Sequence, residues 1–233
     1  MLKLLIARPS PFARKARVAL REKGIAHEEI IDNPWLPGNG VAANNPLGKV
    51  PVLFLADGTT LHDSKVIIGY LETLPAKVKL LPPPGAARVA HRQIEAVADG
   101  VCDAVVLLVL ERARAVQSAE WNARQMKKVE AGCAMLEQGL RQAQRQAQQE
   151  AQQEAQQEAR QPAQRAAPPA WLVEDSYGLA DIATGCALGY LDLRLSEFEW
   201  RTRHPQLAAF FAHIDARPAF AATRPEAQAI PQQ

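Results

Sequence analysis

The chain has 233 residues, of which 48% are hydrophobic, and this length suffices for one large or two small globular domains. A formal net charge of only +2 argues against the strongly basic surface of a nucleic-acid-binding protein, so no nucleic-acid partner is expected. The three cysteines (Cys102, Cys133 and Cys186) are far apart and the five histidines show no ligand spacing, so we expect free, buried thiols and no metal site.

The first predicted strand covers residues 2–7, an apolar run that is broken at Arg8. This run is too short for a signal peptide or a membrane span, so a cytoplasmic protein without a membrane partner is expected. Ser10 and Pro11 then predict a helix start, because a serine oxygen accepts a free N–H of the first turn and proline fits the first helical position. The predicted helix continues to Lys23.

A second strand is predicted at residues 25–31, which completes a strand–helix–strand unit. After a loop at residues 32–49, two short β-prone runs at residues 50–55 and 59–62 flank an Asp-Gly turn, which is typical of a hairpin. The pattern then changes to that of a helix at residues 64–74, which begins with an acid and a hydroxyl side chain. The order βαβ-ββα is that of a thioredoxin-like domain.

Three prolines and a glycine at residues 82–85 separate this part from a second, helical part. The sequence therefore predicts an α/β domain at residues 1–78, a linker at 79–85 and an all-α domain at 86–233. Apolar residues at three- and four-residue steps mark the helices of the second domain, and the tail from Pro218 is predicted to be loop. The helices are expected at residues 86–117, 119–140, 177–193 and 204–217.

Residues 141–169 look like a low-complexity insertion in the helical domain. Alanine recurs every four residues among glutamine, glutamate and arginine, all of which favour a helix. However, a four-residue period drifts around a helix of 3.6 residues per turn, and alanine buries little surface. The stretch is therefore expected to be either a solvated helical extension or a disordered segment.

Three N-terminal stretches together resemble the glutathione S-transferase superfamily. They are residues 10–15 (SPFARK), residues 45–52 with their Val-Pro pair, and the Asp-Ser pair at residues 63–64. The stretches Ile94-Glu95-Ala96 and Ala98-Asp99-Gly100 extend the similarity, which is greatest to the bacterial serine-type (YibF-like) group. The resemblance implies the thioredoxin-like domain followed by an all-helical domain.

The second half of the chain also carries the resemblance. Leu179-Ala180-Asp181 looks like the N-capping motif of the superfamily's sixth helix, and residues 205–207 and 217–220 look like its C-terminal helix. The family pattern has serine or threonine three residues before the aspartate, where this chain has Gly178. The side-chain half of a capping box is therefore expected to be lost.

The resemblance implies a glutathione-binding site. Val50 is expected to pair through its backbone with the cysteinyl part of glutathione, next to a cis Pro51, and Asp63 and Ser64 are expected to hold the γ-glutamyl end. Lys49 either faces the glycyl carboxylate or is an ordinary solvated lysine. Glutathione would act as a co-substrate, and no metal is implied.

Ser10 is the expected catalytic residue. A free thiol has a pKa near 8.5, so little of it is thiolate at neutral pH. A hydroxyl hydrogen bond and the field at the amino end of a helix would stabilise the thiolate of glutathione. The alternative is that Ser10 only caps the helix, and the Asp63–Ser64 pair has the same alternative.

Three functions are compatible with these residues. The first is a glutathione transferase that joins the thiolate to a small hydrophobic electrophile, with a pocket between the domains against the first long helix. The second is a glutathione-dependent disulfide or peroxide reductase, and the third is a non-catalytic regulator on the same fold. The family further implies a homodimer, in which Asp103 could reach the ligand of the partner subunit. Trp35 is expected to serve packing or loop surface.

Overall fold

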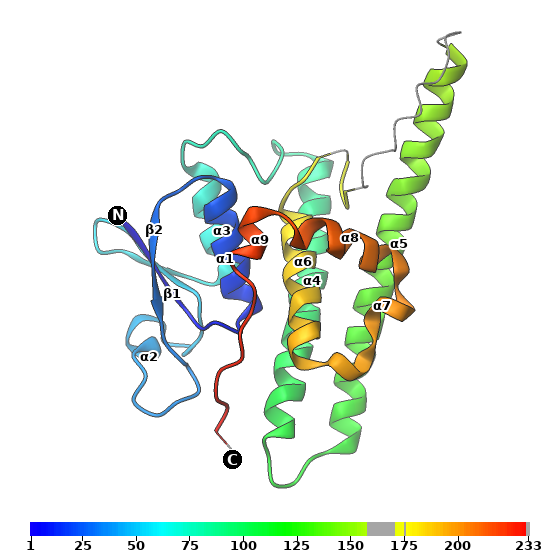
Figure 1. The fold of residues 1–233 in the computed structure, drawn as a ribbon. Coiled ribbons are helices and arrows are strands. Elements are labelled where there is room, and N and C mark those ends of the chain that lie inside the picture. Colours follow the sequence, from blue (N-terminus) through cyan, green and yellow to red (C-terminus); the bar gives the residue numbers. More distant parts are fainter. Residues whose placement is uncertain (158–170, 175, 232–233) are drawn as a thin grey trace.

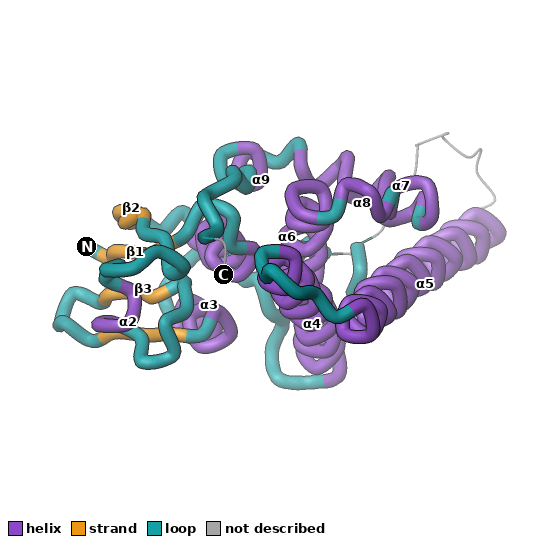
Figure 2. Tube along the Cα trace, turned by 90° about the horizontal axis from the view of Figure 1, so that it is seen from below, coloured by secondary structure: helices purple, strands orange, loops and turns teal. Residues whose placement is uncertain are grey.

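The computed structural model describes residues 1–157, 171–174 and 176–231. It has a small sheet with helices at one end of the molecule and a group of longer helices at the other (Figure 1). Seen from below, the strands lie on one side and helices α4 to α8 on the other (Figure 2). The predicted fold class, a thioredoxin-like α/β part followed by an all-α part, is confirmed.

The sheet has the strand order β2-β1-β3-β4. Strand β1 (Leu2–Ile6) pairs in parallel with β2 (His27–Ile31) and antiparallel with β3 (Val52–Phe54). Strand β4 (Thr60–His62) pairs antiparallel with β3, so the predicted strand–helix–strand unit and the hairpin are both present.

Alternating side chains of the strands divide the small domain into two layers. Leu4 and Ile6 of β1 belong to the main core, which α1 (Pro11–Glu22) and α3 (Ser64–Thr73) cover. Leu5 points to the other face, where it packs in a separate cluster beside α2 (Val41–Asn44). Residues 32–49 were predicted to be loop, but they contain this short helix, whose first residue, Val41, is buried against the sheet.

The helical part is built around α6 (Leu179–Arg194), in which every residue from Leu179 to Leu191 is buried. It contacts α4 (Ala86–Arg112), α1 and α8 (Pro205–Asp215). Its glycines permit this close packing, since a Cβ atom at Gly189 would overlap the guanidinium group of Arg14. The remaining elements are η1 (Ser196–Phe198), α7 (Trp200–Arg203) and α9 (Pro218–Ala221), and the last of these lies where a loop was predicted.

Helix α5 (Ala119–Gln157) continues through much of the low-complexity stretch. None of the side chains of residues 141–149 is buried, which is the geometry of a solvated helical extension. Residues 158–169 of the predicted insertion lie outside the described residues. Within the described part of the chain, no helix is long and apolar enough to cross a membrane.

Two neighbouring cations of α1 connect the two parts of the chain. Lys15 is buried, and its Nζ atom lies 2.8 Å from Glu95 and 2.7 Å from Asp99 of α4. Arg14 is also buried and lies 3.2 Å from Asp215 of α8, with its guanidinium group over the Phe220 ring. Burial alone lowers the pKa of Lys15, but the charges of Asp99 and Glu95 outweigh it and raise the pKa, so this lysine stays charged.

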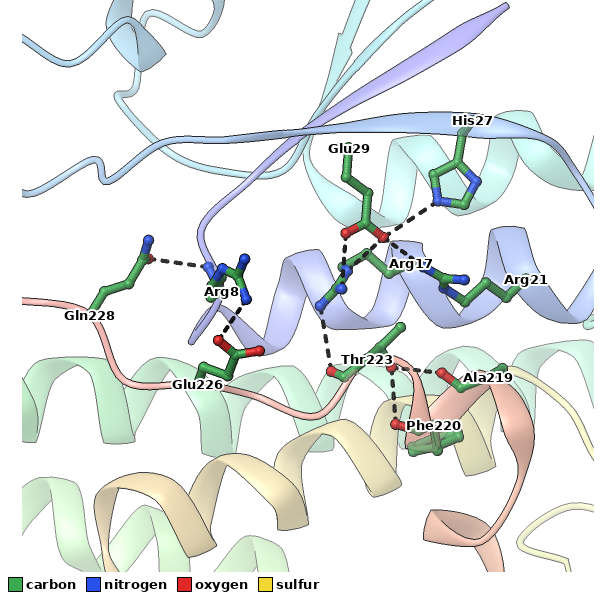
Figure 3. A network of polar contacts seen from close by, with 10 residues as sticks. All are labelled: Arg8, Arg17, Arg21, His27, Glu29, Ala219, Phe220, Thr223, Glu226 and Gln228. Carbon is green, nitrogen blue, oxygen red and sulfur yellow. Dashed lines mark hydrogen bonds and ion pairs between the residues drawn. The ribbon is translucent and has the colours of Figure 1, made fainter.

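A second polar network joins β2 to α1 (Figure 3). The Glu29 carboxylate lies 2.9 Å from Arg17, 3.2 Å from Arg21 and 3.6 Å from the His27 ring. Burial raises the pKa of Glu29, but the His27 ring and the two arginines outweigh it and lower the pKa to about 2. The ionised carboxylate is therefore strongly preferred in the folded protein.

We expect Glu29→Gln to lower the free energy of unfolding by about 1–2 kcal/mol at pH 7, with allowance for partial exposure. The folded pKa lies below the ordinary value of 4.5, so the wild-type contribution is present at neutral pH and is lost as the pH falls from about 4.5 towards 2. Urea unfolding at several pH values measures the difference. The control is Glu28→Gln, since Glu28 is half-exposed in its pair with Lys3 and little change is expected; equal losses in both variants would contradict the assignment.

Candidate functional site

Ser10 lies at the start of α1, where Pro11 occupies the first helical position. Its Oγ atom accepts the backbone N–H of Ala13 at 3.2 Å, so Ser10 does cap the helix. The side chain is half-buried, and no acceptor among the described residues takes its hydroxyl proton. Ser10 can therefore cap the helix and donate a hydrogen bond to a ligand at the same time.

The Val50–Pro51 peptide bond is cis, as the family resemblance implies. The strand ladder begins only at Val52, and within the described residues the N–H and C=O groups of Val50 have no partner. The buried Asn45 side chain holds the preceding loop, because its Nδ2 atom donates to the Lys49 carbonyl at 2.7 Å. The backbone of Val50 is thus fixed, and it is open to an added strand.

Asp63 and Ser64 lie where β4 passes into α3. Asp63 has a left-handed φ of 62°, and its carboxylate accepts the N–H of Lys65 at 2.7 Å. Such a backbone conformation costs a non-glycine residue about 1–3 kcal/mol, so it persists only where its surroundings enforce it. Ser64 is buried, but its hydroxyl has no hydrogen-bond partner among the described residues.

Two adjoining cavities bring the predicted site residues together. The larger, of about 310 Å³, lies beside Ser10, and the smaller, of about 170 Å³, lies beside Pro51, Asp63 and Ser64. The two cavities adjoin one another and together form one groove, since they share five lining residues: Phe12, Leu47, Lys49, Val50 and Asp103. All six residues predicted from the sequence therefore line one groove: Ser10, Lys49, Val50, Pro51, Asp63 and Ser64.

Charges of both signs surround the smaller cavity. Lys65 lies 3.6 Å from Asp99, which belongs to the buried cluster around Lys15. Asp103 of α4 lines this chain's own groove, and burial raises the pKa of its carboxyl group while Lys49 and Lys65 partly lower it. The region suits a small ligand that carries both an ammonium and a carboxylate group.

Sequence reasoning missed several residues of the larger cavity. Trp35 was expected to serve packing or loop surface; it does pack against the main core, and it also lines the cavity. Tyr190 of α6 is buried there, and burial raises its pKa to about 12, so the phenol stays protonated. Val106 and Leu110 follow Asp103 at helical spacing, and this spacing would have identified them as residues on the same helix face. No sequence signal marks Gln228, which also lines the cavity.

The three cysteines are buried, and none of them is among the residues that line the groove. Burial raises the pKa of Cys133 to about 12 and that of Cys186 to about 11, and it also raises that of Cys102. These thiols are therefore poor nucleophiles. Among the residues that the structure describes, no three histidine, cysteine or acidic side chains gather where they would hold a metal ion.

Comparison with known proteins decides the family. Residues 9–74 match the family model for the glutathione S-transferase N-terminal domain, and residues 119–213 match the model for the C-terminal domain. An Escherichia coli (strain K12) protein described as the uncharacterized GST-like protein YibF is 34% identical over 226 residues, which are 96% of this chain and 98% of that protein. The chain belongs to the glutathione S-transferase family.

Two solved glutathione S-transferases are similar to this chain over nearly all of its length. One from Methylobacterium radiotolerans, in complex with glutathione sulfonate, is 39% identical with a TM-score of 0.84 and covers 100% of this chain and 98% of its own. Another, from Methylobacillus flagellatus with glutathione bound, is 37% identical with a TM-score of 0.82 and covers 97% of this chain and 100% of its own.

Proposed function

We propose that the groove binds glutathione, with its sulfur beside Ser10, and that the protein catalyses attack of the thiolate on a small hydrophobic electrophile, in which a carbon–sulfur bond forms and the bond to a leaving group such as a halide ion breaks. One observation carries the proposal: the Ser10 hydroxyl, the Val50 backbone and the Asp63–Ser64 pair line the same groove, and no acceptor for the Ser10 hydroxyl proton and no partner for the Val50 backbone occurs among the described residues. Each of these features matches one part of the tripeptide, and similar solved proteins contain glutathione or its sulfonate.

The proposed roles follow from the chemistry of each group. The Asp63 carboxylate and the Ser64 hydroxyl bind the ammonium and carboxylate of the γ-glutamyl end, and the Val50 backbone pairs with the cysteinyl part as an added strand. Lys49 faces the glycyl carboxylate. Ser10 donates its hydroxyl proton to the thiolate sulfur, so it stabilises and orients the nucleophile without forming a covalent bond itself.

The apolar cavity beside Ser10 is the proposed electrophile site. Phe12, Trp35, Val106 and Leu110 supply much of its apolar wall, and Tyr190 supplies a protonated phenol. A reductase that used a thiol of the protein has little support, because all three cysteines are buried. Any reduction of a disulfide or peroxide would therefore use glutathione itself.

Titration calorimetry with glutathione tests the binding step. Rates with an aromatic halide and with a mixed disulfide then separate conjugation from reduction. A protein that binds glutathione but turns over neither substrate would be a non-catalytic binder. A wild-type protein that does not bind glutathione at all would overturn the proposal.

Ser64→Ala is expected to weaken glutathione binding about tenfold, because a hydrogen bond to a charged group contributes roughly 1.5–3 kcal/mol. Calorimetry measures the dissociation constant. Ser196→Ala is the matched control, since Ser196 is exposed at the start of η1 and does not line the groove. If Ser64→Ala and Ser196→Ala bind glutathione as tightly as the wild type, the assignment of Ser64 is wrong.

A further inference from the structure

The C-terminal tail after α9 crosses back over the N-terminal part of the chain (Figures 1 and 3). The Thr223 carbonyl accepts a long hydrogen bond of 3.5 Å from Arg17, and the Glu226 carboxylate lies 2.6 Å from Arg8. Farther along, the Asn33 side chain donates to the Ala229 carbonyl at 2.9 Å. These contacts fix the tail against helix α1 and against two loops, one after β1 and one after β2.

Gln228 occupies the central position of this tail. Its Oε1 atom accepts the backbone N–H of Arg8 at 3.1 Å, only two residues before Ser10 (Figure 3). Gln228 also lines the 310 Å³ cavity beside Ser10. No other residue from 223 to 231 lines that cavity. Gln228 therefore connects the loop that carries Ser10 with the wall of the cavity.

We propose that Gln228, held in place by the contacts of the tail, forms part of the wall of the cavity beside Ser10 and limits the size of the group that an electrophile can place there. This inference rests on the proposed function, because it concerns the substrate class of the same site. A volume of about 310 Å³ lies at the small end of ligand cavities, which span roughly 300–1,000 Å³. The matching electrophile is compact and apolar, with about one aromatic ring.

The experiment measures the affinities of glutathione and S-benzylglutathione by calorimetry. Gln228→Trp is expected to weaken S-benzylglutathione binding about tenfold more than glutathione binding, because a larger side chain in a packed cavity excludes the ring. Ala227→Trp is the matched control, since Ala227 is exposed on the same tail and does not line the cavity. It is expected to bind both ligands like the wild type.

The possible outcomes separate this inference from the function on which it rests. If the wild type does not bind glutathione, the proposed function is wrong and the inference fails with it. If the wild type binds glutathione but the two tryptophan variants behave alike towards S-benzylglutathione, or Gln228→Trp weakens both ligands equally, only the inference is overturned. Failure of S-benzylglutathione to bind to a wild type that binds glutathione would also overturn the inference alone.

Discussion

Ser10→Ala is expected to lower kcat/KM for conjugation about 30-fold, because the thiolate loses a charge-assisted hydrogen bond of roughly 2 kcal/mol. The hydroxyl proton of Ser10 has no other acceptor among the described residues, so this bond does not compete with one in the free protein. Glutathione affinity at a pH where the thiol is neutral should change little. Steady-state rates with an aromatic halide measure the effect.

The pH profile distinguishes this role from helix capping. Without the hydroxyl, the pKa that governs kcat/KM should rise by about 1.5 units, since each unit corresponds to about 1.4 kcal/mol. Loss of the cap to Ala13 alone would lower the free energy of unfolding by about 1 kcal/mol and leave the profile in place. Ser10→Thr is the control because it keeps both a hydroxyl and a cap. An unchanged rate and profile in Ser10→Ala would show that Ser10 only caps the helix.

Local signals explain why the N-terminal part could be predicted closely. The Ser10–Pro11 start of α1, the Asp-Gly turn of the hairpin and the acid before α3 each act within a few residues, so they can be identified without knowledge of the fold. The short helix α2 gave no such signal, whereas α9 does begin with a proline, Pro218, at a position from which the tail was nevertheless expected to be loop. Both helices form where buried residues such as Val41 and Phe220 pack against distant elements, and this packing is not visible in the sequence.

The same distinction holds for the groove. The residues expected to hold the tripeptide lie at chain positions with marked local chemistry, and the structure brings all of them to one groove. The wall of the larger cavity, in contrast, comes from four distant regions: the loop with Trp35, helix α4, Tyr190 of α6 and Gln228 of the tail. Only the tertiary fold places these together, so the sequence could indicate packing for Trp35 and a loop-like tail around Gln228 but not the cavity that both residues line.

Gly178 shows how a departure from the family pattern is compensated. Serine or threonine in its place would accept a free N–H at the start of α6, but here His91 of α4 does so, with Nδ1 3.1 Å from the Ala180 nitrogen. A Cβ atom at Gly178 would lie 2.6 Å from the His91 ring, so the glycine and the histidine fit together. Burial lowers the pKa of His91, which keeps the ring neutral and able to accept. Residue 178 therefore provides no side-chain hydrogen bond, as expected, and a side chain of α4 accepts the Ala180 N–H instead.

Asp181→Ala is expected to lower the free energy of unfolding by about 4 kcal/mol, because it leaves two buried N–H groups unpaired at roughly 1–3 kcal/mol each. The fully buried carboxylate accepts the N–H of Gly178 at 2.8 Å and that of Leu172 at 3.0 Å. The first bond closes the turn into α6, and the second fixes the segment that enters it. Urea unfolding followed by circular dichroism measures the change.

Asp181→Asn serves as the control, since its single carbonyl oxygen can accept one of the two N–H groups while its amide group faces the other. It should therefore lose less stability than Asp181→Ala, although both substitutions remove the same ionisable group, whose pKa burial raises to about 7. Because the folded state disfavours the charge, its removal cannot account for a loss of stability, and equal losses in the two variants would contradict the assignment to the hydrogen bonds. A loss below about 1 kcal/mol in Asp181→Ala would mean that His91 and the Leu80 carbonyl, which accepts the Leu179 N–H at 2.8 Å, hold the start of α6 without Asp181.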